Sequence, residues 1–156
     1  GLDGRIEAVA DGGACPVGVE STILGLAGPE PMLLRPGGVP VEALEAALDR
    51  PVDMRGDDDG LSAPGQMRSH YAPRVPVRLE ADAPRPGEVM LGFGAVAADL
   101  NLSQAGDLTE AAANLFHHLH ALDRMGAEGI AVSPIPERGL GRAINDRLRR
   151  AAAPRG

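Results

Sequence analysis

The amino-acid sequence predicts an α/β protein made of two unlike parts joined by a long linker. Residues 77–156 alternate strand-like apolar runs with amphipathic helical segments, a pattern that favours a mainly parallel sheet with crossover helices. Residues 1–50 carry short apolar runs that glycine and proline interrupt. Residues 51–76 hold repeated glycine, proline and aspartate with almost no apolar periodicity, which indicates a functional loop or a connection between domains.

In the first part we expect three strands and one helix. The alternation of apolar and polar residues at 5–10 predicts a half-buried strand, and the apolar runs at 17–26 and 32–34 predict two more. Pro40 suits the start of a helix, because the first helical positions need no N–H partner. The apolar stripe of that helix consists of Val41, Leu44 and Leu48.

In the last part we expect strands at residues 75–79, 88–92 and 129–133 and helices at 107–125 and 140–152. The apolar stripe of the first helix consists of Leu108, Ala112, Leu115, Leu119 and Leu122. The stripe of the second helix consists of Leu140, Ile144, Leu148 and Ala151.

Local signals mark both ends of the helix at 107–125. Asp107 is a suitable N-cap, and Glu110 stands three residues later, as in a capping box. Gly126 provides the residue that commonly ends a helix.

Composition excludes several classes of function. Acidic residues outnumber basic ones by 22 to 15, and the formal net charge of −7 opposes strong direct binding of nucleic acid. An aromatic content of 2% is too low for a platform that stacks bases. The longest apolar stretch, residues 90–98, is too short to cross a membrane. A single cysteine suits a reducing compartment, so we expect a cytoplasmic protein.

Two short motifs in the first part could bind a small molecule. Ser21 and Thr22 place two hydroxyl groups beside a carboxylate, and such groups hydrogen-bond an amino acid or a phosphate. The alternative is a polar patch at the end of a strand. Arg35 precedes a turn of proline and glycine, and a guanidinium held in this way suits bidentate contact with phosphate. The alternative there is a surface ion pair.

The linker carries a third motif. Residues 62–73 gather Met67, Arg68, His70 and Tyr71 between two turns that contain proline. His70 and Tyr71 suggest contact with a base, a sugar or a phosphate, whereas a plain tether would need none of these side chains. No combination of residues predicts a metal site of the chain's own.

These motifs together resemble the two-domain threonylcarbamoyl-AMP synthases. The resemblance rests on residues 15–23 (CPVGVESTI), 34–38 (LRPGG), 63–73 (APGQMRSHYAP) and 135–152, in the order of that family. It implies the C-terminal remnant of a YrdC-like α/β catalytic domain at 1–50, a strap over the active site at 51–76, and a small Rossmann-like domain at 77–156. The missing first part of the catalytic domain would precede Gly1, so we expect this chain alone to be inactive.

The resemblance also implies an activity. Such enzymes join L-threonine, bicarbonate and ATP, with Mg²⁺, into threonylcarbamoyl-AMP and release pyrophosphate. A partner transferase then modifies an adenosine of tRNA. By motif, Ser21 and Thr22 would contact threonine, and Arg35, His70 and Tyr71 would contact the nucleotide, while no catalytic acid or base is assigned. The alternative function is a non-catalytic Rossmann-like module that binds a nucleotide or a protein partner.

Overall fold

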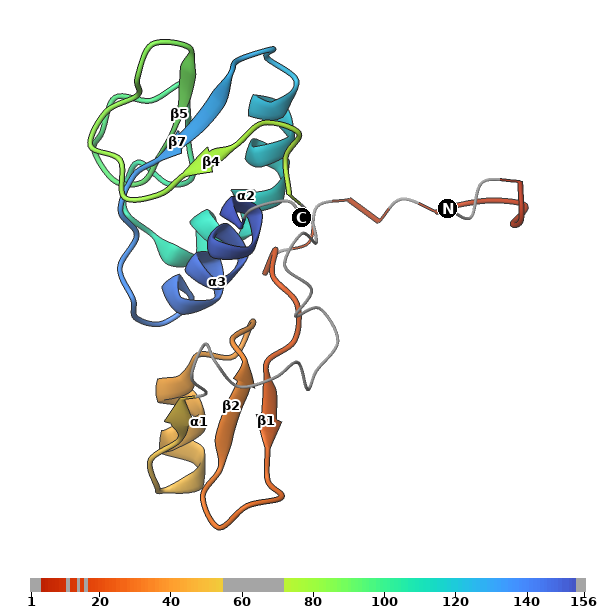
Figure 1. The fold of residues 1–156 in the computed structure, drawn as a ribbon. Helices are drawn as coiled ribbons and strands as arrows, with labels where there is room; N and C mark the ends of the chain where they lie inside the picture. Colours follow the sequence, from red (N-terminus) through yellow and green to blue (C-terminus); the bar gives the residue numbers. More distant parts are fainter. Residues whose placement is uncertain (1–3, 11, 14, 16, 55–71, 154–156) are drawn as a thin grey trace.

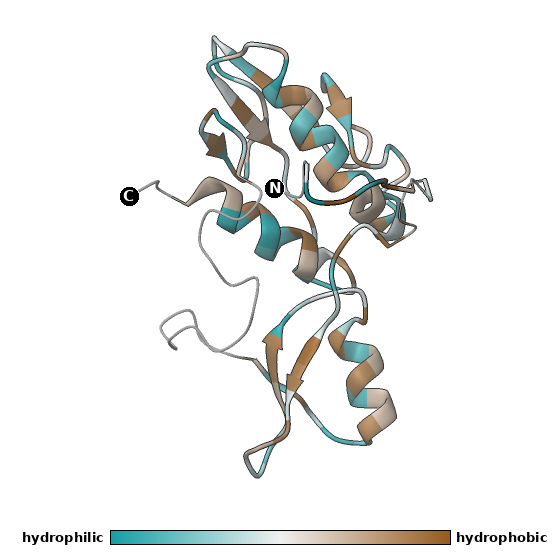
Figure 2. Cartoon of the chain, turned by 90° about the vertical axis from the view of Figure 1, so that its right-hand side faces the viewer, coloured by the Kyte–Doolittle hydropathy of each residue, from teal (hydrophilic) through white to brown (hydrophobic). Residues whose placement is uncertain are grey.

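The computed structural model describes residues 4–10, 12–13, 15, 17–54 and 72–153, which form two α/β units (Figure 1). The elements of the first unit are β1 (Ile23–Gly25), β2 (Met32–Arg35), α1 (Val41–Leu48) and β3 (Asp53–Met54). Those of the second are β4 (Val77–Arg78), β5 (Glu88–Gly92), β6 (Leu100–Asn101), α2 (Leu108–Asp123), β7 (Gly129–Val132) and α3 (Gly141–Ala152). Helix α3 lies on the side of the second unit that faces the first unit (Figures 1 and 2).

The first unit is a three-stranded sheet with one helix against it. β1 and β2 pair antiparallel, and β3 joins β2 in parallel after the crossover through α1. Its core is small, with Leu33, Val41 and Val52 buried and Leu24 and Leu44 packed against them. Because side chains alternate along a strand, Met32 lies on the face opposite Leu33, where 38% of it is exposed. The described elements therefore leave that face of the sheet open.

The second unit is built on a parallel sheet. Its strand order is β4-β7-β5-β6, and every neighbouring pair is parallel, as the sequence predicts. β7 at the centre is buried along its whole length. Helices α2 and α3 pack on one face and form the main core with it. Loops cover the opposite face, where Ala81, Met90 and Ala131 are buried.

The caps of α2 explain where that helix begins and ends. The Asp107 carboxylate accepts hydrogen bonds from the backbone N–H of Thr109 and Glu110, at 2.7 and 2.9 Å. Gly126 adopts φ +75°, a left-handed conformation that glycine takes at little cost. The capping box itself does not close. Glu110 instead accepts a hydrogen bond from Ser103 Oγ, which in turn accepts from Asp107 N.

Two expectations about strands were wrong, and two strands were not expected. Residues 5–10 form no strand and are exposed, because nothing among the described residues pairs with them. The run at 17–26 is a strand only at its end, in β1. Two short strands are new: β3 lies in the range expected to be linker, and β6 lies before α2. Both are two residues long, too short to leave a periodic pattern.

Candidate functional site at the junction of the two units

The segment before β1 packs against the second unit and then continues into β1 of the first unit. Gly18 has φ +66°, and a Cβ atom there would lie 2.0 Å from the carbonyl oxygen of Ala112 in α2. Val19 packs against the main core of the second unit. The close contact with α2 and the left-handed conformation both require glycine at position 18, and they bring residues 20–22 beside α3.

The loop after β2 folds back onto residues 20–22. A Cβ on Gly37 would lie 2.4 Å from Glu20 O, Ser21 C and Thr22 N, so only glycine fits there. Gly38 N donates to Glu20 O at 2.9 Å. The two motifs that the sequence singles out are thus held in direct backbone contact.

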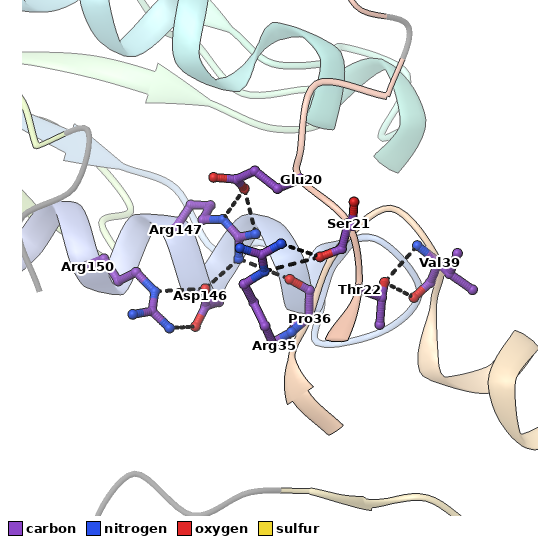
Figure 3. Close-up of polar contacts among 9 residues, drawn as sticks. All are labelled: Glu20, Ser21, Thr22, Arg35, Pro36, Val39, Asp146, Arg147 and Arg150. Atoms are coloured by element: carbon purple, nitrogen blue, oxygen red, sulfur yellow. Dashed lines mark hydrogen bonds and ion pairs between the residues drawn. The ribbon is translucent and has the colours of Figure 1, made fainter. Parts of the chain in front are cut away.

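Side chains from both segments complete this contact (Figure 3). Arg35 donates from Nη2 and Nε to the Ser21 carbonyl oxygen, at 2.8 and 3.1 Å. The Thr22 hydroxyl donates to Val39 O at 2.8 Å and accepts from Val39 N at 2.9 Å. Ser21 is exposed. The hydroxyl of Thr22 is therefore occupied in holding the loop, whereas Ser21 presents its side chain to solvent.

Arg147 of α3 enters this junction from the second unit (Figure 3). Its side chain is only 4% exposed. Nε donates to Glu20 Oε2 at 2.7 Å, Nη2 lies 2.6 Å from the same oxygen, and Nη1 donates to Pro36 O at 3.0 Å. Asp146 accepts from Arg147 Nη1 at 2.5 Å and also pairs with Arg150 at 2.8 Å. The junction thus gathers three guanidinium groups and two carboxylates.

The neighbouring arginines keep the Glu20 carboxylate ionised. Partial burial favours the protonated form of Glu20, but the hydrogen bond and charge of Arg147, with the charge of Arg35, hold the pKa of the Glu20 carboxyl below its ordinary value. The guanidinium groups of Arg35, Arg147 and Arg150 all lie in this cluster. Guanidinium groups suit an anionic ligand such as a phosphate or an amino-acid carboxylate.

Two further contacts tie the parts of the chain together. Glu42 of α1 pairs with Arg142 of α3 and accepts from Gly139 N at 3.3 Å. At the end of the linker, Asp123 accepts from the backbone N–H of Arg74 and Val75, at 2.6 and 3.3 Å. The start of α3 is thereby linked to the first unit, and the end of α2 fixes the point where the linker enters the second unit.

The structure places the predicted site residues as follows. Ser21, Thr22 and Arg35 come together at the junction, and Arg35 contacts Ser21 directly. His70 and Tyr71 lie outside the described residues. The sequence interpretation missed Arg147. The available signal was its position on the buried face of its helix, three residues after Ile144 and four before Ala151.

Neither a metal centre nor a membrane span occurs in the parts of the chain that the structure describes. There, no three His, Cys, Asp or Glu side chains come together in a way that would hold a metal ion. No helix among those residues has the length and apolar character needed to cross a bilayer.

The arrangement defines a two-unit α/β protein in which Arg147 of the parallel-sheet unit contacts the loops that carry Ser21 and Arg35. Residues 39–153 match the family model described as threonylcarbamoyl-AMP synthase, C-terminal domain. The chain belongs to this family.

Relatives and solved structures agree with this assignment. The threonylcarbamoyl-AMP synthase of Pyrococcus abyssi is 34% identical over 171 residues, covering 96% of this chain and 50% of the relative. That of Bacillus subtilis is 33% identical over 180 residues, covering 99% and 51%. The crystal structure of P. abyssi Sua5 complexed with L-threonine superimposes with a TM-score of 0.78 at 33% identity, covering 96% and 50%. The chain therefore spans about half the length of these relatives and fits the C-terminal portion of a Sua5-type protein.

Proposed function

We propose that this chain is part of a longer threonylcarbamoyl-AMP synthase, which makes threonylcarbamoyl-AMP and pyrophosphate from L-threonine, bicarbonate and ATP. The family match and the identity to synthases of P. abyssi and B. subtilis support the activity. The observation that carries the proposal is the direct contact between the Ser21 and Arg35 segments, which brings an exposed serine beside a guanidinium group.

We assign the threonine side of this site to Ser21. Thr22 contributes by holding the loop, since both of its hydroxyl contacts are to Val39. The similar P. abyssi Sua5 was crystallised in complex with L-threonine, which supports an amino acid as ligand.

We assign the nucleotide side to Arg35, His70 and Tyr71. A guanidinium suits the phosphates of ATP. A second solved P. abyssi structure, with a TM-score of 0.70 at 28% identity, carries a neighbouring His and Tyr both replaced by Ala. The superposition covers 96% of this chain and 49% of the P. abyssi chain. The single tyrosine of our sequence follows His70 directly, which supports the choice of this pair.

The chemistry asks the protein for positioning and charge neutralisation. The threonine amine and bicarbonate give a carbamate and one molecule of water, and a carbamate oxygen then attacks the α-phosphorus of ATP while the bond to pyrophosphate breaks. Arg35 would balance charge on the phosphates, and water would be kept from the carbamate by the segment at 62–73. Mg²⁺ would enter with the triphosphate, which usually supplies much of its coordination, and we assign no carboxylate of this chain to it.

The product of the proposed reaction must pass to a partner protein. The product is a mixed anhydride that water hydrolyses, so a transferase that acts on tRNA must take it promptly. We place both proteins in the cytoplasm.

The test is product formation by the full-length protein that contains this chain. Mass spectrometry should detect threonylcarbamoyl-AMP when threonine, bicarbonate and ATP are all present, and pyrophosphate release should fall to background when either threonine or bicarbonate is omitted. Release of pyrophosphate without threonine, or no adenylate at all, would contradict the proposal.

A further inference from the structure

Arg147 is a buried charge on a surface that joins two units. A guanidinium that is 4% exposed is costly unless its donors are paired, and a well-packed apolar residue often stabilises such a position as well or better. Its partners lie mainly outside its own helix, because Glu20 and Pro36 belong to the first unit. Stability alone therefore gives little reason for arginine here.

The atoms that Arg147 contacts suggest what it does. Glu20 is the neighbour of Ser21 in the chain, and Pro36 is the neighbour of Arg35. One guanidinium thus bonds to both segments of the site, at 2.7 Å to the Glu20 carboxylate and 3.0 Å to the Pro36 carbonyl (Figure 3). Because its three nitrogens form a rigid planar fork, the group fixes the spacing between these two partners.

Asp146 keeps the fork in its orientation. It accepts from Arg147 Nη1 at 2.5 Å, and it is itself held by Arg150 one helical turn later, at 2.8 and 2.9 Å. Contacts within α3 of the second unit therefore hold the Arg147 guanidinium in the orientation in which it bonds the first unit.

We infer that Arg147 is a positioning residue through which the C-terminal domain sets the geometry of the threonine and ATP site. This inference rests on the proposed function. It assigns the second unit a role in substrate binding that requires no contact between that unit and either substrate. Arg147 acts through the Glu20 carboxylate and the Pro36 carbonyl, which belong to the two segments that carry Ser21 and Arg35.

A second ion pair between the described parts of the two units provides a control. Arg142 pairs with Glu42, and these side chains are 28% and 50% exposed. The Glu42 carboxylate accepts from Arg142 and from Gly139 N, and neither of these hydrogen bonds involves residues 20–22 or 35–38. If Arg147 only held the two units together, replacing Arg142 would have the same effect as replacing Arg147. If Arg147 positions the site, only the replacement of Arg147 will change substrate binding.

The kinetic test compares three single variants of the full-length protein. Arg147→Lys tests the positioning role, and Arg142→Met and Arg149→Met are the controls. Lysine keeps the charge but cannot bond both Glu20 and Pro36 in the same fork. We expect Arg147→Lys to raise the KM for threonine and for ATP by about tenfold, the loss typical of charged hydrogen bonds. Arg149 pairs only with Glu137 of its own unit in the described structure, so Arg149→Met and Arg142→Met should leave both KM values within about twofold.

A second measurement does not depend on activity. The amide of Gly38 bonds to Glu20 O and that of Val39 to Thr22 Oγ1, so their hydrogen exchange reports the closed junction. Arg147→Lys should speed exchange at both amides by about tenfold, and Arg142→Met should not.

Three outcomes would overturn the inference or its foundation. Unchanged KM values and unchanged exchange in Arg147→Lys would overturn the positioning role, and so would equal effects in Arg142→Met. A parent protein with no threonine-dependent activity would refute the proposed function instead, and the exchange measurement would still decide whether Arg147 holds the junction.

Discussion

Replacing Gly37 by alanine tests whether the two site segments touch. The added Cβ would lie 2.4 Å from Glu20 O, Ser21 C and Thr22 N. All three are backbone atoms, which cannot rotate away as the end of a side chain can. The loop must therefore move, and the bonds from Arg35 to Ser21 O and from Gly38 N to Glu20 O must lengthen or break.

The magnitude follows from the cost of overpacking. Inserting a methyl group into a well-packed place costs about 1–3 kcal/mol, and we expect about 3 kcal/mol here because none of the three contacts can yield. With a urea dependence on the order of 1–3 kcal/mol per molar, the midpoint of unfolding of the first unit should fall by at least about 1 M. Amide NMR signals of β2 and α1 follow this unit separately from the second.

Gly28→Ala is the matched control, because a Cβ there has only one neighbour, Glu30 O, at an ordinary 3.7 Å. Its free energy of unfolding should stay within about 0.5 kcal/mol of the parent, as for most surface substitutions. If Gly37→Ala unfolds at the same urea concentration as Gly28→Ala, the close approach of the two segments is wrong, and with it the site built on that approach.

Three further predictions concern the activity of the chain alone, the segment at residues 62–73, and the carboxylate of Glu88. The 156-residue chain alone should release no pyrophosphate above background with threonine, bicarbonate and ATP, because it spans only half of its relatives; substrate-dependent release would contradict this. In the full-length protein, ATP with threonine should slow proteolysis within residues 62–73, and joint replacement of His70 and Tyr71 by alanine should lower turnover without changing the melting temperature. Unchanged turnover and no protection would reduce the segment to a tether. The hydrogen bonds from Arg78 and from Arg85 N lower the pKa of Glu88 from 4.5 to about 2. Its contribution to stability is therefore complete above pH 4.5 and is lost as the pH falls towards 2, so the urea midpoint should drop less between pH 6 and pH 3 in Glu88→Gln than in the parent.

Much of the second unit could be predicted from the sequence, because its signals are local. The stripe of α2 repeats over four turns, and Leu115, Leu119 and Leu122 are all buried as that stripe requires. Asp107 caps the helix as its position suggests. The strand expected at residues 5–10 shows the limit of such signals, since alternation creates a strand only where a neighbouring strand supplies hydrogen bonds.

The site was only partly predictable for a different reason. Ser21 and Arg35 stand out in short motifs, but the bond between Glu20 and Arg147 joins residues 127 positions apart. No local pattern specifies which helix face meets which loop across two units. Thr22 shows the same gap: its hydroxyl also bonds the backbone of Val39, a contact that no local pattern indicates.

If Ser21 binds threonine and Arg35 binds the phosphates of ATP, steady-state kinetics of Ser21→Ala and Arg35→Ala in the full-length protein will separate the two substrates. Loss of a neutral hydrogen bond of about 0.5–1.5 kcal/mol in Ser21→Ala should raise the KM for threonine about 2- to 12-fold and leave that for ATP nearly unchanged. Loss of a charged contact of about 1.5–3 kcal/mol in Arg35→Ala should raise the KM for ATP by about tenfold or more. The ratio of the two KM values should therefore shift in opposite directions in the two variants, whereas a general loss of folded protein would leave it constant. Parental KM values for both substrates in both variants would contradict both assignments.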